Sequence, residues 1–238
     1  MPPFLGQLSL FPFDVEPSGW IRCDGRDVPI VQFDNLFFAL GNTFGGDGQD
    51  FFALPNLEAV APKGCHYCIS YDGLPTSFDE RAVGEILLTV VTENSLTPAN
   101  LLECDGRSLS KNQFPMLSHL VGTLFGGDNT NFKLPDLRSK APAKCRYVIA
   151  TKGNDPAVPR DDLVFLGELM LLPFDVKSDR LRLCNGDLLP SQTTDACGVL
   201  GKKFGGDNQR CALPNLRKAG PLNFDYYINM RGRLPTPG

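Results

Sequence analysis

One pattern occurs three times along this chain of 238 residues, in the same order and with a period of 79 to 81 residues. Each copy contains Cys-Asp/Asn-Gly, then Phe-Gly-Gly-Asp, then Leu-Pro-Asn/Asp-Leu. These landmarks begin at Cys23, Phe44 and Leu54 in the first copy, at Cys104, Phe125 and Leu134 in the second, and at Cys184, Phe204 and Leu213 in the third. The chain is therefore a tandem array of one small module, and such arrays present surfaces more often than they assemble one catalytic centre.

The three copies divide the chain into modules and links. The repeats are predicted at 1–73, 84–153 and 167–238, joined by links at 74–83 and 154–166 that are rich in proline and charge. A module of about 70 residues buries only a modest core by itself, so packing against its siblings would add buried area. We therefore expect a monomer whose copies lie around a pseudo-threefold axis. A linear stack of modules, or a homo-oligomer of the whole chain, is the alternative.

Each module is predicted to open and close with a β-strand. The opening strands are apolar runs that begin at a glycine, at 6–10, 84–88 and 167–171. The closing strands contain a tyrosine and end at a glycine, at 67–73, 147–153 and 227–232. Asp-Gly and Asn-Gly pairs accept the positive φ values of tight turns between antiparallel strands. Such pairs predict hairpins at 21–29, 101–109 and 181–189.

A short helix is predicted in the middle of each module. Apolar residues at helical spacing place these helices at 31–40, 112–121 and 192–200, each followed by a glycine that suits a helix terminus. The expected fold class is α+β and mainly β. It consists of three tandem modules, each with short antiparallel strands, a hairpin and one short helix.

Charge and hydropathy exclude several classes of function. The net charge is −4, and Lys and Arg are mixed among Asp and Glu without a basic stripe, so nucleic acid is not an expected partner. No apolar run approaches the roughly 20 residues of a membrane span, so no membrane insertion is expected. The start Met1-Pro2-Pro3-Phe4 lacks the charged region and apolar run of a signal peptide, which indicates synthesis in the cytoplasm.

The eight cysteines allow a disulfide interpretation and a packing interpretation. Cys23 and Cys65 in the first copy, and Cys104 and Cys145 in the second, could form equivalent bridges. The third copy has Phe224 at the second of these positions, which indicates a buried apolar slot. Free cysteines packed as small hydrophobic residues are therefore favoured.

Two motifs could suggest a bound ion, but neither has the spacing that such a site needs. The C-x-x-C at 65–68 has no second cysteine pair at finger-like spacing, so neither zinc nor a redox role is expected. Phe-Gly-Gly-Asp is not followed by the Lys-Ser/Thr of a phosphate-binding loop or by the spaced carboxylates of a calcium loop. No cofactor or metal is predicted. The favoured interpretation is a turn whose Phe fills the core and whose Asp caps backbone amides.

Loops between the strands are the part of each module where binding residues are most readily placed. The candidate ligand-binding residues are Asp47, Gln49, Asp50, Asp128, Asn129, Asn131, Asp207, Asn208 and Arg210. The motif residues predicted to fix the backbone are Gly25, Gly45, Gly46, Pro55, Gly106, Gly126, Gly127, Pro135, Gly186, Gly205, Gly206 and Pro214.

The order of these motifs resembles the phage tail collar domain, a module also found in microcystin-dependent-protein-like bacterial and phage proteins. The first copy is the most similar, with Gly19, Trp20 and the segment 44–48. Leu101 and Leu181 stand near the position of that tryptophan in the other copies, so the copies have drifted and need not share a binding role. The resemblance implies a tail-associated structural or adhesive protein of a virion or tail-like particle. It implies other tail or baseplate-like proteins as partners.

The favoured function is a non-enzymatic tail-fibre or tip component that binds a cell-surface glycan or receptor. One alternative is a purely structural connector of a tail-like particle. Another is a bacterial protein repurposed from a tail module for binding a glycan or protein partner. An enzyme is not expected, because His66 and His119 occupy non-equivalent places, predicted as strand and helix, without a nucleophile signature nearby. Trp20 is expected to fill the core rather than to stack on a sugar.

Overall fold

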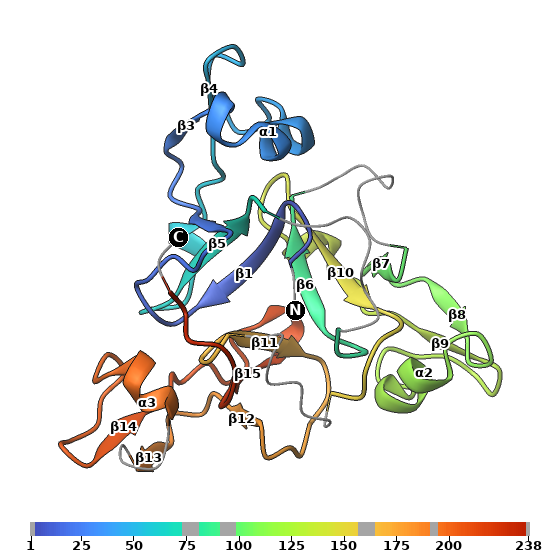
Figure 1. Ribbon diagram of the computed structural model, residues 1–238. Coiled ribbons are helices and arrows are strands. Elements are labelled where there is room, and N and C mark those ends of the chain that lie inside the picture. The colour runs from blue at the N-terminus through green and yellow to red at the C-terminus, as the bar shows by residue number, and fades with distance from the viewer. Residues whose placement is uncertain (1–2, 73–80, 91–98, 157–164, 191–194, 237–238) are drawn as a thin grey trace.

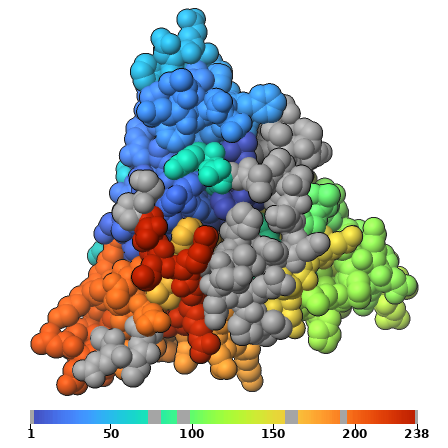
Figure 2. Space-filling view, in the orientation of Figure 1, coloured from blue at the N-terminus to red at the C-terminus, as the bar shows by residue number. Residues whose placement is uncertain are grey.

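The computed structural model describes residues 3–72, 81–90, 99–156, 165–190 and 195–236. The three repeats form a central β-sheet hub from which three arms project (Figure 1). The space-filling outline is triangular, with one arm at each corner (Figure 2). The expected fold class is confirmed, because the chain is mainly β, antiparallel and built from three modules, each with one short α-helix.

Every module contributes three strands to the hub and a two-stranded sheet with a helix to its arm. The first module comprises β1 (Gln7–Phe11), β2 (Trp20–Arg22), β3 (Asp27–Pro29), η1 (Ile30–Gln32), α1 (Asp34–Leu40), β4 (Phe51–Ala53), η2 (Glu58–Val60) and β5 (His66–Ser70). The second comprises β6 (Ile86–Thr89), β7 (Leu101–Glu103), β8 (Ser108–Ser110), α2 (Pro115–Val121), β9 (Asn131–Lys133), η3 (Arg138–Lys140) and β10 (Arg146–Ala150). The third comprises β11 (Leu169–Leu172), β12 (Leu181–Leu183), β13 (Leu188–Pro190), α3 (Asp195–Leu200), β14 (Arg210–Ala212), η4 (Pro221–Asn223) and β15 (Asp225–Asn229).

The hub repeats one pairing scheme three times. In each module an inner strand (β1, β6 or β11) pairs with a middle strand (β5, β10 or β15), which pairs with an edge strand (β2, β7 or β12). The three groups join because β6 also pairs with β1 and with β11, and all these pairings are antiparallel. The inner strands therefore meet at the centre of the molecule, as a pseudo-threefold arrangement requires.

The registers bring equivalent residues to this centre. Each inner strand places one leucine opposite the tyrosine of its middle strand, in the pairs Leu10↔Tyr67, Leu88↔Tyr147 and Leu171↔Tyr226. All six side chains are buried in one hydrophobic cluster, and all six line one cavity of about 30 Å³. The hydroxyl oxygens of Tyr67 and Tyr226 lie 3.5 Å apart. The core of the hub is thus shared by the three modules.

A side chain that lies just before the inner strand of each module packs on the sheet of the next module in the ring. Phe4 packs with residues of β6, β7 and β10, and Ala82 packs with residues of β11, β12 and β15. Phe165 packs with residues of β1, β2 and β5, and its ring centroid lies 6.3 Å from that of Phe11. The third module also reaches the first through the Thr236 carbonyl, which accepts a hydrogen bond from the Ser18 amide at 3.1 Å. Together these contacts close the modules into a ring.

The hairpins predicted at 21–29, 101–109 and 181–189 are wrong. In the first module β2 pairs with β5 and β3 pairs with β4, so the two halves of the predicted hairpin belong to different sheets. Gly25 has the expected positive φ of 84°, but this bend carries the chain from the hub into the arm. A Cβ atom on Gly25 would lie 3.0 Å from the Asn56 side chain. The Asp-Gly signal specifies a sharp bend only, whereas a distant segment supplies the pairing partner.

That distant segment is Leu-Pro-Asn/Asp-Leu, which closes the base of each arm. The amide of its second leucine donates to the cysteine carbonyl of the Cys-Asp/Asn-Gly tripeptide, from Leu57 to Cys23 at 2.9 Å, from Leu137 to Cys104 at 2.7 Å and from Leu216 to Cys184 at 2.7 Å. Both leucines of every copy are buried. The arm is therefore anchored to the hub by apolar burial and by one repeated backbone hydrogen bond.

An opening and a closing strand are found in every module as predicted, but the closing strands end at Ser70, Ala150 and Asn229, three residues before the predicted glycines. Of these glycines, Gly73 lies outside the described residues. Two helices are shorter than predicted at the start. A 3-10 turn occupies 30–32 before α1, and α2 begins at Pro115, whose fixed φ suits the first helical position. Residues 192–194 of the third predicted helix lie outside the described residues. The glycine after each helix has a positive φ of 54° to 57°.

Substituting Phe4→Ala tests the contact between the first and second modules. The side chain is 1% exposed, so its removal leaves a cavity that costs about 3 kcal/mol of unfolding free energy. Urea denaturation followed by tyrosine and tryptophan fluorescence measures this change. Phe38→Ala is the control, because that side chain is 78% exposed and its loss costs less than about 0.5 kcal/mol. Equal losses for the two variants would contradict the proposed ring closure.

Candidate functional site

The Phe-Gly-Gly-Asp loops lie at the tips of the arms, which we define as arm 1 (27–57), arm 2 (108–137) and arm 3 (188–216). In arm 1 the Asp47 carboxylate accepts hydrogen bonds from the backbone amides of Gln49, Asp50 and Phe51, each at 2.9 Å. These bonds lower the pKa of Asp47. The aspartate thus caps its own loop.

The other two tips use the same device with different neighbours. Asp128 accepts from the amides of Thr130 at 2.7 Å and Asn131 at 2.8 Å, and these and further bonds lower its pKa. Asp207 accepts from the amide of Gln209 at 2.8 Å and pairs with Arg210 at 2.7 Å, and its pKa is lowered mainly by that arginine. Each carboxylate is therefore charged at neutral pH and accepts hydrogen bonds from its own loop.

The second glycine of the motif lets two backbone segments approach closely. Gly46 forms an isolated bridge with Phe52, and a Cβ atom there would lie 2.5 Å from the Phe52 Cα. Its φ of 93° is also unfavourable for other residues. Gly127 and Gly206 show the same bridge and the same close approach. Backbone geometry therefore accounts for the second glycine of the motif in all three copies.

The phenylalanine of the motif contacts the neighbouring module. The rings of Phe125 in the second module and Phe224 in the third lie 5.7 Å apart. Lys144 of the second module lies over the Phe44 ring of the first at 5.5 Å. The Phe204 ring of the third module lies so close to Gly64 of the first that a Cβ there would be 2.8 Å away. These phenylalanines pack against the main core, and they also link module to module in the same cyclic order.

The structure places the nine candidate binding residues on three separate tips. Asn131 is half-buried and the other eight are exposed. Because each set belongs to its own arm and the arms lie at different corners (Figure 1), the candidates do not converge on one pocket. Any ligand of these residues would be contacted by one arm at a time or spread across the molecule.

The arms differ in charge and in exposed apolar surface. Arm 1 contains four Asp and no Lys or Arg, whereas arm 2 contains two Asp and two Lys, and arm 3 contains two Asp, two Lys and one Arg. Arm 1 also exposes Val31, Phe38 and Phe51 at 88%, 78% and 44%. Its surface is therefore acidic and carries exposed phenylalanines, whereas the exposed large apolar residues of the other arms are Met116, Leu124 and Leu188.

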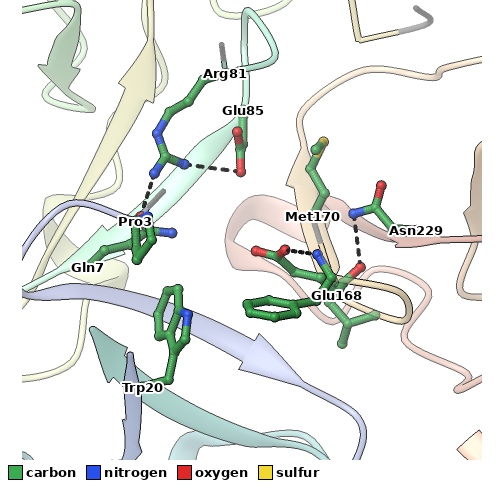
Figure 3. Close-up of a pocket in the computed structure, with 10 residues that line it drawn as sticks. Pro3, Gln7, Trp20, Arg81, Glu85, Glu168, Met170 and Asn229 are labelled. Atoms are coloured by element: carbon green, nitrogen blue, oxygen red, sulfur yellow. Dashed lines mark hydrogen bonds and ion pairs between the residues drawn. The ribbon is translucent and has the colours of Figure 1, made fainter. Parts of the chain in front are cut away.

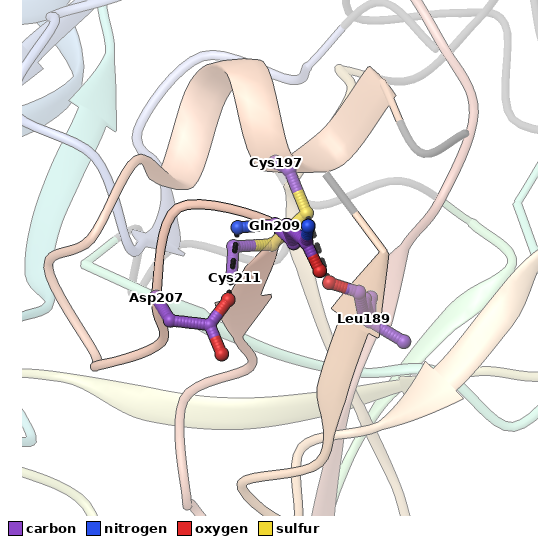
Figure 4. Close-up of a disulfide and its surroundings, with 5 residues drawn as sticks. All are labelled: Leu189, Cys197, Asp207, Gln209 and Cys211. Atoms are coloured by element: carbon purple, nitrogen blue, oxygen red, sulfur yellow. Dashed lines mark hydrogen bonds between the residues drawn. A yellow bond between two sulfur atoms is a disulfide. The ribbon is translucent and has the colours of Figure 1, made fainter. Parts of the chain in front are cut away.

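Arm 3 contains a disulfide that the sequence analysis missed. Cys197 of α3 is bonded to Cys211 of β14, which joins the helix to the two-stranded sheet (Figure 4). In arm 1 the equivalent contact is made by Phe37 and Phe52, whose ring centroids lie 5.4 Å apart. The helix of arm 3 is also poorer in large apolar side chains, with Ala196 where arm 1 has Leu36. A covalent bond thus replaces an aromatic contact in the arm with the smaller core.

Reducing this disulfide is expected to loosen arm 3 selectively. Closing a loop with a sequence separation of 14 residues stabilises a fold by roughly 3 kcal/mol, so the α3 amides should exchange about 100-fold faster after reduction. Hydrogen exchange with and without dithiothreitol measures this. The amides of α1 are the internal control, since arm 1 contains no cysteine. Unchanged α3 exchange would show that the bond has no structural role.

A buried polar cluster lies at one end of the hub. Gln7, Glu85 and Glu168 are equivalent, because each follows the glycine that precedes an inner strand. They line one cavity of about 10 Å³ together with Arg81 and Asn229, about the smallest volume that holds a water molecule (Figure 3). The pseudo-threefold axis therefore carries one amide and two carboxyl groups where a symmetric trimer would repeat one residue.

The cluster is only partly paired. Arg81 donates to the Gln7 side chain and lies 3.6 Å from a Glu85 oxygen. Glu168 accepts from the Phe165 amide at 3.1 Å. Burial raises the pKa of Glu85 and of Glu168, and nearby positive charge only partly offsets this effect. The folded hub therefore holds these protons more tightly than the unfolded chain does.

This raised pKa predicts a pH dependence of stability. The stabilisation from a proton on Glu168 is full below the ordinary glutamate value of 4.5 and is lost as the pH rises through the folded pKa. Urea denaturation between pH 4.5 and 8 should therefore show a falling unfolding free energy, and Glu168→Gln should flatten the fall. Glu58→Gln, on exposed η2, should keep the wild-type slope. Parallel profiles for Glu168→Gln and the wild type would refute this account.

The remaining candidates of the sequence analysis lie in structural positions. His66 lies buried in β5 and His119 exposed on α2, as predicted, in different modules. Trp20 is 4% exposed and packs edge-on against Phe11 at 5.4 Å, which confirms its place in the core. Cys23 and Cys104 are free and buried, as expected for small packed residues. No group of three His, Cys, Asp or Glu in the described ranges could hold a metal ion.

The comparison with protein families gives the repeat its name. The description of the family model that matches is Phage Tail Collar Domain, and it matches three times, at residues 6–62, 84–142 and 167–221. These ranges cover most of the chain, so the protein belongs to this family. Its members are structural proteins of the phage tail-fibre type, a class not known for enzymatic activity. No curated protein and no solved structure matches the chain.

Membership of this family places the chain among phage tail components. In the part of the chain that the structure describes, no helix has both the length and the apolar character needed to cross a membrane.

Proposed function

We propose that this chain is a fibre or tip component that attaches a tail-like particle to a cell surface through the tips of its arms. The proposal is supported by a structural difference between the hub and the arms. The hub side chains are buried where the three modules pack together, whereas the arms project to the corners and expose polar loops (Figure 2). Binding residues are most often held on loops by a rigid scaffold. The receptor is a cell-surface glycan or protein.

Arm 1 is the arm that makes the principal contact. Phe38 and Phe51 are exposed large aromatic side chains, and arm 2 has His119 and Asn131 at the equivalent positions. Aromatic residues of this kind supply most of the binding energy when a partner buries them. Asp47 and Asp50 lie in the same arm, so the partner surface should combine an apolar contact with positive charge or hydroxyl donors.

A structural connector is the second candidate. The observation in its favour is that the carboxylates of Asp47, Asp128 and Asp207 are bonded within their own loops. Tips stabilised in this way would serve equally well as fixed contacts to other tail or baseplate-like proteins. The same surface would also suit a bacterial protein repurposed for binding.

Cell binding by matched variants separates these functions. Fluorescently labelled protein is incubated with a panel of intact bacterial strains, and retention is measured by flow cytometry. The double variant Phe38→Ser, Phe51→Ser should lose at least about tenfold in affinity, the loss of a typical hot-spot contact. Met116→Ser in arm 2, which is 43% exposed, is the control and should bind as the wild type does.

Two outcomes contradict parts of this proposal. Wild-type retention by the double variant would refute the role of arm 1. Absence of retention on every strain would refute the adhesive function and favour the connector.

A further inference from the structure

An open hollow lies on the third module, at the outer edge of its part of the hub. It has a volume of about 710 Å³ and lies between the loop 175–179 and strand β12, with Tyr227 of β15 in its wall. This volume is within the range of small-ligand sites, which is roughly 300 to 1,000 Å³. The hollow is therefore large enough for a ligand of several rings.

The first module closes the equivalent surface. Asp14 corresponds to Asp175, since both belong to a Pro-Phe-Asp-Val segment. Lys203 of arm 3 reaches over to pair with Asp14 at 2.7 Å, and Val199 of the same arm packs with the Trp20 cluster. Arm 3 thus covers the first module at this place.

Among the described residues, the third module has no ion pair at Asp175 that corresponds to the Lys203–Asp14 pair. Its neighbour in the cyclic order is arm 2, which has Leu124 where arm 3 has Lys203, directly before Phe-Gly-Gly-Asp. Leu124 is 58% exposed and brings no cation to Asp175, which instead accepts a hydrogen bond from the Tyr227 hydroxyl at 3.3 Å. The hollow therefore results from a departure from the pseudo-symmetry.

The lining offers both donors and acceptors beside apolar surface. Lys177, Asp179 and Arg182 are exposed and form no ion pair with the described residues. Val176 and Leu183 are partly buried and pack against the cluster that contains Tyr227. Strand β12 pairs only with β15 among the described strands, and its three residues all line the hollow.

These features suit a ligand with many hydroxyl groups. A ligand with one strong charge would meet a like charge in the lining, whereas a hydroxyl group donates to a carboxylate and accepts from Lys or Arg. The C–H faces of a sugar ring are apolar enough to pack on aliphatic side chains. Hydroxyl-rich, ring-shaped ligands of this chemistry are saccharides.

We propose that this hollow binds a saccharide. Asp175 and Asp179 accept hydrogen bonds from its hydroxyl groups, Lys177 and Arg182 donate to them, and Leu183 packs against a ring face. The hollow is separate from the arm tips, so this site holds or fails independently of the adhesive role proposed for arm 1.

Nuclear magnetic resonance on the ¹⁵N-labelled full chain tests the proposal. The probes are maltotriose, lactose and chitotriose, each added up to roughly 20 mM, a range suited to weak binding. At least one should shift the amide signals of 175–183 and Tyr227. Asp179→Asn and Arg182→Ala should each weaken that binding by about tenfold, the loss of one charge-assisted hydrogen bond. Asp27→Asn, an exposed aspartate of arm 1, is the control and should leave the affinity unchanged.

The proposal is overturned if none of the three sugars shifts these signals, or if both variants of the hollow bind as the wild type does. Shifts confined to the arm tips would also overturn it, while agreeing with an adhesive function of the arms.

Discussion

Burial of the three inner strands is the constraint on which this structure depends. β1, β6 and β11 are buried along their whole length, yet a single module supplies only three hub strands and a small arm. The apolar faces of the inner strands meet one another and the three tyrosines at the centre. Covering these faces requires all three modules, so the ring is the unit that folds and the repeat alone is not.

A single chain can break the symmetry that it imitates. At the axis it places Gln7 with Glu85 and Glu168, and it adds the buried Arg81 from the link before the second module. Three identical subunits would have to repeat one residue at this position. The same freedom explains an acidic arm 1, a disulfide-linked arm 3 and the hollow beside β12 in the third module. Repetition fixes the scaffold, while the differences between copies give each corner its own chemistry.

The sequence predicted what depends on local signals and on repetition. The opening and closing strands, the glycines after the helices and the Asp caps follow from residue type and spacing. The pairing of β2 with β5 does not, because it joins segments more than 40 residues apart whose meeting depends on the whole module. A turn signal such as Asp24-Gly25 cannot tell a hairpin from a corner between two sheets.

The disulfide was hidden for a different reason. Cys211 replaces Phe52 of arm 1, and Cys197 replaces Phe37. The second replacement is shifted by one residue in the sequence when the copies are aligned at Gly25 and Gly186. The two substitutions pair up only when the arms are superimposed. The polar cluster at the axis was visible as a Gly-Gln/Glu pair before each inner strand, but its convergence is a property of the ring.

Small-angle X-ray scattering of the full chain in solution tests the central claim most directly. A closed ring predicts a three-lobed envelope and a radius of gyration near 20 Å, slightly above the roughly 18 Å of a compact chain of this length. Three separate modules along an extended path, with a radius of gyration well above about 30 Å, would contradict the closed ring.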